Sequence, residues 1–136
     1  MRLLNRFLFC RKSQLPNAGD GLFTNKKIEK YQIICCYDGP HITNKQWKIS
    51  GWNVNLLQID ENTCIDGKNC QARKINDANG ISKKVGCNNN CRFIIENKKA
   101  FIVATRDIEK GEELFVGYGE NYWIDYCKYM EGTKEI

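Results

Sequence analysis

The chain has 136 residues, a length that suits one domain with a single hydrophobic core. Hydrophobic residues make up 42% and charged residues 27%, as in ordinary soluble globular proteins. The net charge of +5 comes without any long run of basic residues, which argues against nucleic-acid binding as the main function. No apolar stretch approaches the ~18 residues of a membrane span.

The N-terminal segment MRLLNRFLFCRK imitates a signal peptide, but Asn5 and Arg6 interrupt its apolar run. We therefore expect an intracellular protein. Net charge is uneven, with +6 in residues 1–50 and −1 in residues 51–136. A basic first half is compatible with work near nucleic acid, as on a nucleosome, although scattered lysines are also typical of a solvated surface.

Eight cysteines are present, yet no Cys-x-x-Cys occurs. Only Cys87 and Cys91 have a spacing suited to metal ligands, and the single histidine, His41, is far away in the chain. Because a structural zinc site needs four ligands, we expect no metal. Because the protein is expected to be intracellular, we expect its thiols to be reduced. The pair Cys35-Cys36 lies in the apolar run IICCY and is typical of small core residues.

The first part of the chain predicts short strands around a turn. We expect strands over Leu3–Cys10 and Leu22–Thr24, joined by residues 13–21, which are dense in turn formers. Gly19 and Gly21 form a Gly-x-Gly step, whose bare backbone can approach a ligand or simply make a hairpin turn. Gln32–Tyr37 is too short for a helix and predicts a buried strand.

The middle of the chain predicts one short helix and several strands. Thr43 is a candidate cap for a helix over Asn44–Lys48, and Asp66 is expected to satisfy turn amides. Trp47 and Trp52 are expected to pack, with a place in a peptide groove as the alternative. The predicted strands are Asn55–Ile59, Thr63–Asp66, Arg92–Ile95, Phe101–Ala104 and Glu113–Val116.

The C-terminal part gathers aromatic residues after a Gly-Tyr-Gly step centred on Tyr118. Glycines on both sides let the backbone bend sharply and point the phenol into a cavity. Tyr122, Tyr126 and Tyr129 recur at i, i+4 and i+7, so a C-terminal helix would present them on one face. A plain aromatic core is the alternative explanation.

Three blocks of sequence, in order, resemble the SET-domain protein lysine methyltransferases. They are NAGDGLFTNKKIEKYQIICCYDG (residues 17–39), ARKINDAN (residues 72–79) and RDIEKGEELFVGYGENYW (residues 106–123). The resemblance covers residues 8–123 and implies one domain over residues 1–136, with residues 124–136 as an aromatic closing segment. The implied fold is mostly β with short helices, a β-clip-like SET domain of several small sheets with a C-terminal pseudoknot.

The resemblance also implies roles for individual residues. Tyr118 would be catalytic at the point of methyl transfer, with Tyr37 as a second catalytic tyrosine on the wall of the lysine channel. Phe93, Phe101, Tyr122 and Tyr126 would line that channel as well. The residues implied in binding S-adenosyl-L-methionine are Ala18, Gly19, Asp20, Gly21, Arg73, Asn76, Asp77, Tyr118 and Trp123.

The central block departs from the family form Arg-Phe-x-Asn-His-Ser-Cys, since Asp77, Ala78 and Asn79 replace its last three residues. The resemblance gives residue 77 contacts to the adenine largely through its backbone, and such contacts survive a change of side chain. Loss of the cysteine, with only Cys127 near the C-terminus, removes the family's post-SET zinc site. We expect the C-terminal aromatics to close the channel instead.

The function implied is S-adenosyl-L-methionine-dependent lysine N-methylation of a protein, most directly a histone tail, with S-adenosyl-L-homocysteine as product. Similarity is greatest to small stand-alone, viral-type SET proteins, which implies action on chromatin in a nucleus and allows a homodimer. The alternatives are the same chemistry on a non-histone protein and a non-catalytic SET-like module that binds cofactor or protein.

Overall fold

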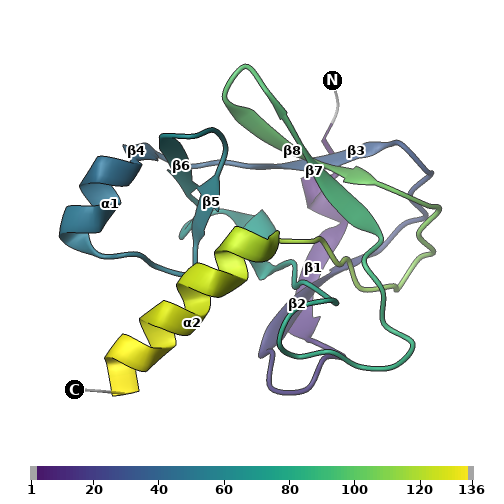
Figure 1. The fold of residues 1–136 in the computed structure, drawn as a ribbon. Coiled ribbons are helices and arrows are strands. Elements are labelled where there is room, and N and C mark those ends of the chain that lie inside the picture. Colours follow the sequence, from purple (N-terminus) through teal and green to yellow (C-terminus); the bar gives the residue numbers. More distant parts are fainter. Residues whose placement is uncertain (1–2, 135–136) are drawn as a thin grey trace.

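The computed structural model describes residues 3–134, and it consists of three small antiparallel sheets with two α-helices (Figure 1). The sheets pair β1 with β2, β3 with β8 and β7, and β4 with β6 and β5. The strands are β1 Leu8–Lys12, β2 Asp20–Thr24, β3 Ile33–Tyr37, β4 His41–Thr43, β5 Leu56–Gln58, β6 Thr63–Asp66, β7 Cys91–Glu96 and β8 Lys99–Ala104. The helices are α1 Asn44–Ser50 and α2 Glu120–Lys134, with 3₁₀ helices η1 Asn5–Phe7 and η2 Gln71–Lys74.

Local sequence explains several of these elements. Thr43 caps α1 in a capping box with Gln46, as the sequence predicts for Thr43. Asn97 and Lys98 both have positive φ, which is the geometry of the tight turn joining β7 to β8. Asp66 accepts a hydrogen bond from the amide of Lys68, in the structural role expected of it.

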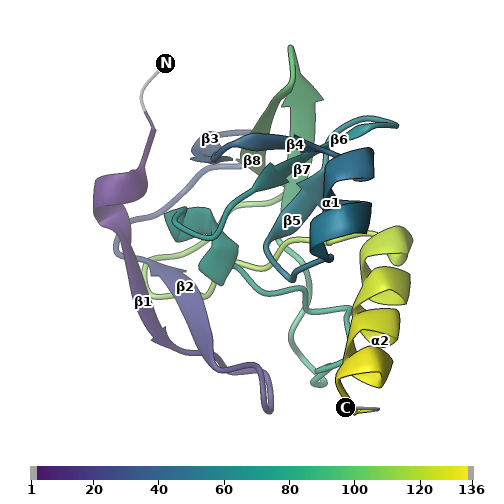
Figure 2. The same cartoon turned by 90° about the vertical axis from the view of Figure 1, so that its left-hand side faces the viewer.

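The three sheets enclose one main hydrophobic core. Strand β3, from the apolar run IICCY, pairs along β8 and contributes buried Ile34 and Cys35. The helices α1 and α2 lie on one side of the molecule and the β1–β2 hairpin on the other (Figure 2). The completely buried hydrophobic side chains of this core are Leu22, Ile28, Ile34, Cys35, Ala100, Ile102, Ile108 and Leu114.

The strand predicted over Leu3–Cys10 is wrong in its first half. Residues Asn5–Phe7 form η1, and the strand runs instead from Leu8 to Lys12. The hairpin pairing ends at Leu8 and Thr24, at the end of β2, and before it the Leu4 amide donates instead to the carbonyl of Ile34 in β3.

The strand predicted over Glu113–Val116 is also wrong, because this segment makes only isolated bridges. Glu113 pairs with Phe23, Phe115 with Asn76, and Val116 with Cys91. Each residue meets a different segment, so no continuous ladder forms. The segment is threaded between residues 76 and 91, which produces the crossing expected of a SET-type pseudoknot.

Candidate active site

Three segments that are far apart in the sequence meet beside the threaded segment. The side-chain amide of Asn76 donates to the carbonyl of Asp20 at 2.9 Å, and the amide of Val116 donates to the carbonyl of Asn76 at 2.9 Å. These bonds join the Gly-x-Gly loop, the central block and the approach to Tyr118. Residues 17–21, 73–77 and 116–123 therefore meet at one place, although they are far apart in the sequence.

Tyr118 is held at both its backbone and its hydroxyl. Its hydroxyl donates to the carbonyl oxygen of Ile75, and its amide donates to Asp77 at 2.9 Å. Burial raises the pKa of the Tyr118 phenol well above its usual range, and the neighbouring phenols of Tyr122 and Tyr37 add to the shift. Tyr118 is therefore a neutral, fixed phenol.

Tyr37 and Phe93 form a second part of the same site, from β3 and β7. Their rings meet edge to face at 6.0 Å, and the Tyr37 hydroxyl donates to the carbonyl of Asn55 at 2.7 Å. Burial raises the pKa of Tyr37 as well. Gly67 lies directly against the ring, since a Cβ at that position would come within 2.3 Å of Tyr37 Cε1.

Helix α2 brings the remaining aromatics onto the site. The ring of Tyr122 lies 4.7 Å from that of Tyr118, and its hydroxyl donates to the carbonyl of Val54 at 3.0 Å. The indole of Trp123 stacks on Tyr118 at 5.6 Å and packs so closely on Gly80 that a Cβ there would lie 2.2 Å from Trp123 Cζ2. These contacts dock the helix on the domain.

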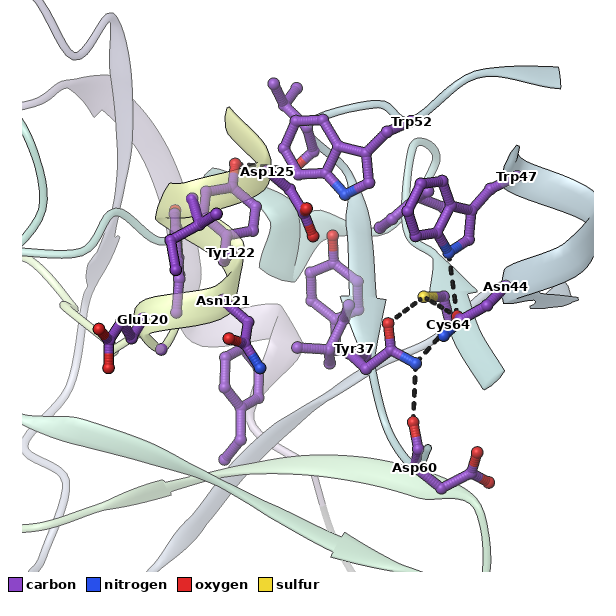
Figure 3. A pocket seen from close by; sticks show the side chains of 18 of the residues that line it. Tyr37, Asn44, Trp47, Trp52, Asp60, Cys64, Glu120, Asn121, Tyr122 and Asp125 are labelled. Carbon is purple, nitrogen blue, oxygen red and sulfur yellow. Dashed lines mark hydrogen bonds between the residues drawn. The ribbon is translucent and has the colours of Figure 1, made fainter. Parts of the chain in front are cut away.

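A cavity of about 840 Å³ opens between α1, α2 and the strands (Figure 3). Its volume falls in the range of ordinary ligand pockets. Aromatic side chains line it from several elements, namely Tyr37, Trp47, Trp52, Phe93, Tyr118 and Tyr122. Both tryptophans line the cavity, and Trp52 also packs edge to face against Tyr122 at 5.4 Å. An aromatic wall of this kind suits the aliphatic stem of a long basic side chain.

Phe101 does not belong to this channel. In the sheet of β3, β8 and β7, Phe101 pairs with Cys36 and Ile94, whereas Phe93 pairs with Ile102. Because neighbours along a strand alternate between faces, Phe101 lies on the opposite face from Phe93 and Tyr37. The expectation that Phe101 lines the channel is corrected accordingly.

Tyr126 lies outside the wall of the cavity. Its ring packs on Trp123 at 5.3 Å and on Tyr122 at 6.4 Å, so it supports two residues of the site from the outer side. Arg73, at the end of η2, is exposed and lines the same cavity as Tyr37.

The residues expected to bind S-adenosyl-L-methionine fit that group in their chemistry. Gly19 has φ +68° with open space over its Cβ position, and Ala18, Gly19 and Asp20 present backbone groups at an accessible loop. Asn76 supplies an amide and the stacked rings of Tyr118 and Trp123 supply flat apolar faces nearby. Gly21 differs from these, because its missing side chain makes room for Glu113.

Glu113 is a buried residue of this region that the sequence did not single out. Its carboxylate accepts from the Ser13 hydroxyl at 2.6 Å and from the Gln14 amide at 2.8 Å. A Cβ on Gly21 would lie 2.2 Å from its Oε2. Glu113 therefore holds in place the residues that lead into the Gly-x-Gly loop, about a hundred positions earlier in the sequence. In the sequence, Glu113 is marked only as the second of two glutamates before the apolar run Leu114–Val116, a pattern that does not indicate a buried carboxylate.

Asn90 is another residue whose role the sequence did not reveal. Its side-chain amide donates to the Glu113 carbonyl at 2.9 Å, and its side-chain oxygen accepts from the Phe115 amide at 2.8 Å. Asn90 is buried, so these two bonds replace strand pairing for the threaded segment.

The cysteines are all free thiols. Burial raises the pKa of Cys91 to about 12, which keeps this thiol protonated. Within residues 3–134, no three side chains of His, Cys, Asp or Glu are grouped so as to hold a metal ion. None of the helices in this range has the length and apolar character needed to cross a membrane.

The model of the SET domain family matches residues 19–119, which is most of the chain and includes Gly19, Asn76 and Tyr118. The chain belongs to the SET domain family. A curated relative is the histone-lysine N-methyltransferase SETD7 of Halocynthia roretzi, which is 23% identical over 123 residues. The match covers 84% of this chain and 32% of that protein, so this SET domain spans about a third of the relative's length.

Proposed function

We propose that this SET domain transfers a methyl group from S-adenosyl-L-methionine to the side-chain amine of a lysine on a protein, most directly a histone tail. The observation that carries the proposal is the fixed Tyr118 phenol, whose hydroxyl donates to Ile75 beside a cavity walled by aromatic rings. Family membership and the named activity of the Halocynthia roretzi relative support it.

The cofactor would be held by residues from the three segments that meet. Backbone groups of Ala18, Gly19, Asp20, Gly21 and Asp77 would face it, with Asn76, Arg73 and Trp123 around it. S-adenosyl-L-methionine supplies a methyl group on a sulfonium and leaves as S-adenosyl-L-homocysteine. The task of the protein is to align and desolvate the amine that takes this methyl.

Tyr118 is suited to orient that amine. Its single proton is committed to the Ile75 carbonyl, so its oxygen presents lone pairs and accepts a hydrogen bond from the amine N–H. This bond turns the nitrogen lone pair away from Tyr118 and along the channel. Tyr37, held by the Asn55 carbonyl, would line the other side of the channel with Phe93.

The site also favours the neutral amine that the reaction needs. A lysine ammonium, with a pKa near 10.4 in water, has no lone pair for attack. Enclosure by Tyr37, Phe93 and Tyr122 disfavours the charged form and lowers the lysine pKa. The raised pKa values of Tyr37 and Tyr118 keep both phenols protonated, so no phenolate is available as a base and solvent takes the proton before or during entry.

The proposal is tested by incubating the purified protein with labelled S-adenosyl-L-methionine and the core histones, followed by peptide mapping. Label on a defined lysine is the expected result. No label on histones, with cofactor binding detected by calorimetry, would favour a non-histone substrate, or a non-catalytic module if other proteins also stay unlabelled. Absence of both label and binding would contradict the proposal.

Action on a histone would place the protein on chromatin, in the host nucleus if it is of the viral type. A homodimer stays a prediction, which light scattering on the purified protein would check.

We also propose that methyl transfer needs no metal, because Tyr122 and Trp123 of α2 pack against Tyr118 and would close the site without the post-SET zinc of the family. A chelator such as EDTA should leave activity and melting temperature unchanged. Loss of activity that added zinc restores would show that cysteines such as Cys87 and Cys91 act as ligands.

A further inference from the structure

The side chain of Asp77 is the most heavily used acceptor near Tyr118. Its Oδ2 accepts from the Tyr118 amide at 2.9 Å and from Trp123 Nε1 at 2.9 Å. Its Oδ1 accepts from the Asn79 amide at 2.9 Å and from Asn89 Nδ2 at 3.1 Å. Four donors thus converge on a carboxylate that is only 6% exposed.

None of these donors is a cation. Within residues 3–134, the ion pairs are Lys74 with Asp20 and Arg106 with Glu112, and Asp77 takes part in neither. A buried carboxylate without a cation depends on hydrogen bonds from neutral groups to stay in place. Asp77 and its four donors therefore form one mutually dependent unit.

We propose that Asp77 is a positioning residue, whose carboxylate fixes the Tyr118 backbone and at the same time fastens helix α2 through the indole of Trp123. This inference rests on the proposed function, in which Tyr118 is catalytic. It adds that the tyrosine and the closing helix are set by one side chain. It also gives the side chain of Asp77 a role, where the family resemblance implies contacts largely through the backbone.

Helix α2 meets the domain through side chains that are at most partly buried. Among its described side chains, Trp123 donates a hydrogen bond to Asp77 and Tyr122 donates one to the Val54 carbonyl. Ring contacts of Tyr122 and Tyr129 with Trp52, and of Trp123 with Tyr118, add to these bonds. Loss of the Asp77 bond should therefore loosen the helix and free the neighbouring tyrosine together.

The chemistry of position 77 explains why a carboxylate serves here. Two N–H groups point at one oxygen and two at the other, so the position needs two oxygens that only accept. A neutral imidazole offers one acceptor nitrogen, and an asparagine offers one acceptor oxygen and an amide NH₂ group that only donates. In Asp77→Asn this NH₂ group would face two N–H donors and leave them unpaired.

The test compares the wild type with Asp77→Asn, Trp123→Phe and the double variant at saturating concentrations of both substrates. We expect Asp77→Asn to lower kcat about 100-fold, the cost of a misplaced catalytic group, with a much smaller change in cofactor Kd measured by calorimetry. Trp123→Phe should have a smaller effect, and the double variant should be no slower than Asp77→Asn alone, because both changes break one linkage.

The matched control is Asp107→Asn, which should behave as the wild type. Asp107 is a surface carboxylate that accepts a hydrogen bond from the Lys30 amide.

Hydrogen exchange of residues 120–126 provides a readout that does not depend on activity. Exchange in α2 should accelerate in both Asp77→Asn and Trp123→Phe and stay unchanged in Asp107→Asn. Should Asp77→Asn fail to fold, Trp123→Phe carries the test. A kcat within about twofold of wild type in a folded Asp77→Asn, unchanged exchange in α2, or additive effects would overturn the inference. An inactive wild type would contradict the proposed function, while exchange would still decide whether Asp77 fastens α2.

Discussion

The ring of Tyr37 occupies space that is free only because Gly67, opposite it, has no side chain. Gly67 follows β6 directly, and a Cβ there would approach Tyr37 within 2.3 Å at Cε1 and 2.6 Å at the hydroxyl. Tyr37 is buried in the main core and bonded to Asn55, so it has no free direction in which to move. The position of this phenol therefore depends on a residue thirty positions away.

Gly67→Ala should consequently lower both stability and activity. Overpacking of this kind costs about 1–3 kcal/mol in the free energy of unfolding. A shifted Tyr37 would also raise the KM for the substrate protein. Urea denaturation and steady-state kinetics measure the two effects. Gly132→Ala is the matched control, because a Cβ at this exposed position of α2 meets nothing within 4 Å, and helix propensity favours alanine there.

At the scale of elements, α2 contributes a carboxylate to the cavity as well as aromatic rings. Asp125 extends between Tyr122 and Trp52 toward the interior of the cavity (Figure 3). The pKa of the nearby Cys64 thiol is raised to about 11, mainly by burial and secondly by the negative charge of Asp125. No ion pair within residues 3–134 involves Asp125, so its charge is available to a substrate cation.

Asp125→Asn should therefore raise the KM for a basic protein substrate while leaving kcat at saturation nearly unchanged. The expected increase in KM is about threefold to tenfold, in the range of a partly exposed charge pair, and it should shrink as salt is added. Glu131→Gln makes the same charge change on the same helix, at a residue that does not line the cavity. Equal effects of the two substitutions would assign the change to net charge alone.

The elements that the sequence predicted well are those whose pattern is local. The apolar run IICCY, the Thr43 cap and the i, i+4, i+7 tyrosines each indicate an element that the structure contains. Residues 113–116 were mispredicted because β-type residues there pair with three different segments rather than one strand. Such pairing depends on the path of the chain, which local sequence does not encode.

The residues of the site also fall into those that a local sequence motif predicts and those that it does not. The Gly-x-Gly step, the Asn76 block and Tyr118 carry motifs, so the sequence alone predicts them as site residues. Apart from the Asn79 amide, the bonds described for Glu113, Asn90 and the side chain of Asp77 join partners 12 to 100 residues away, and no short-range pattern marks these residues. Phe101 was misplaced because its face of the sheet depends on a register that hydrophobic content alone does not set.

At the scale of the whole molecule, enclosed phenols link stability to alkaline pH. Burial raises the pKa values of Tyr37, Tyr118 and Tyr122 in the folded state, so folding favours their neutral forms. This contribution is fully present below the unfolded pKa near 10 and is lost as pH rises above it, because only the unfolded chain then ionises freely.

The expected result is a melting temperature that falls from about pH 10 upward, and phenolate absorbance of these three tyrosines that appears together with unfolding. Tyr122→Phe should reduce this dependence by removing one of the three groups. Tyr31→Phe, at an exposed tyrosine outside the cavity, is the control. Phenolate absorbance of these three tyrosines in the folded protein near pH 10 would contradict the assignment.

The central claim is that the fixed phenol of Tyr118 orients a lysine amine for methylation. The most direct measurement is the rate of labelled methyl transfer by wild type and Tyr118→Phe, with cofactor affinity measured on the same samples. The account predicts a loss of about 100-fold or more in turnover with nearly unchanged cofactor affinity, because one orienting hydrogen bond disappears and the ring remains. A Tyr118→Phe enzyme with turnover within about twofold of wild type would contradict it.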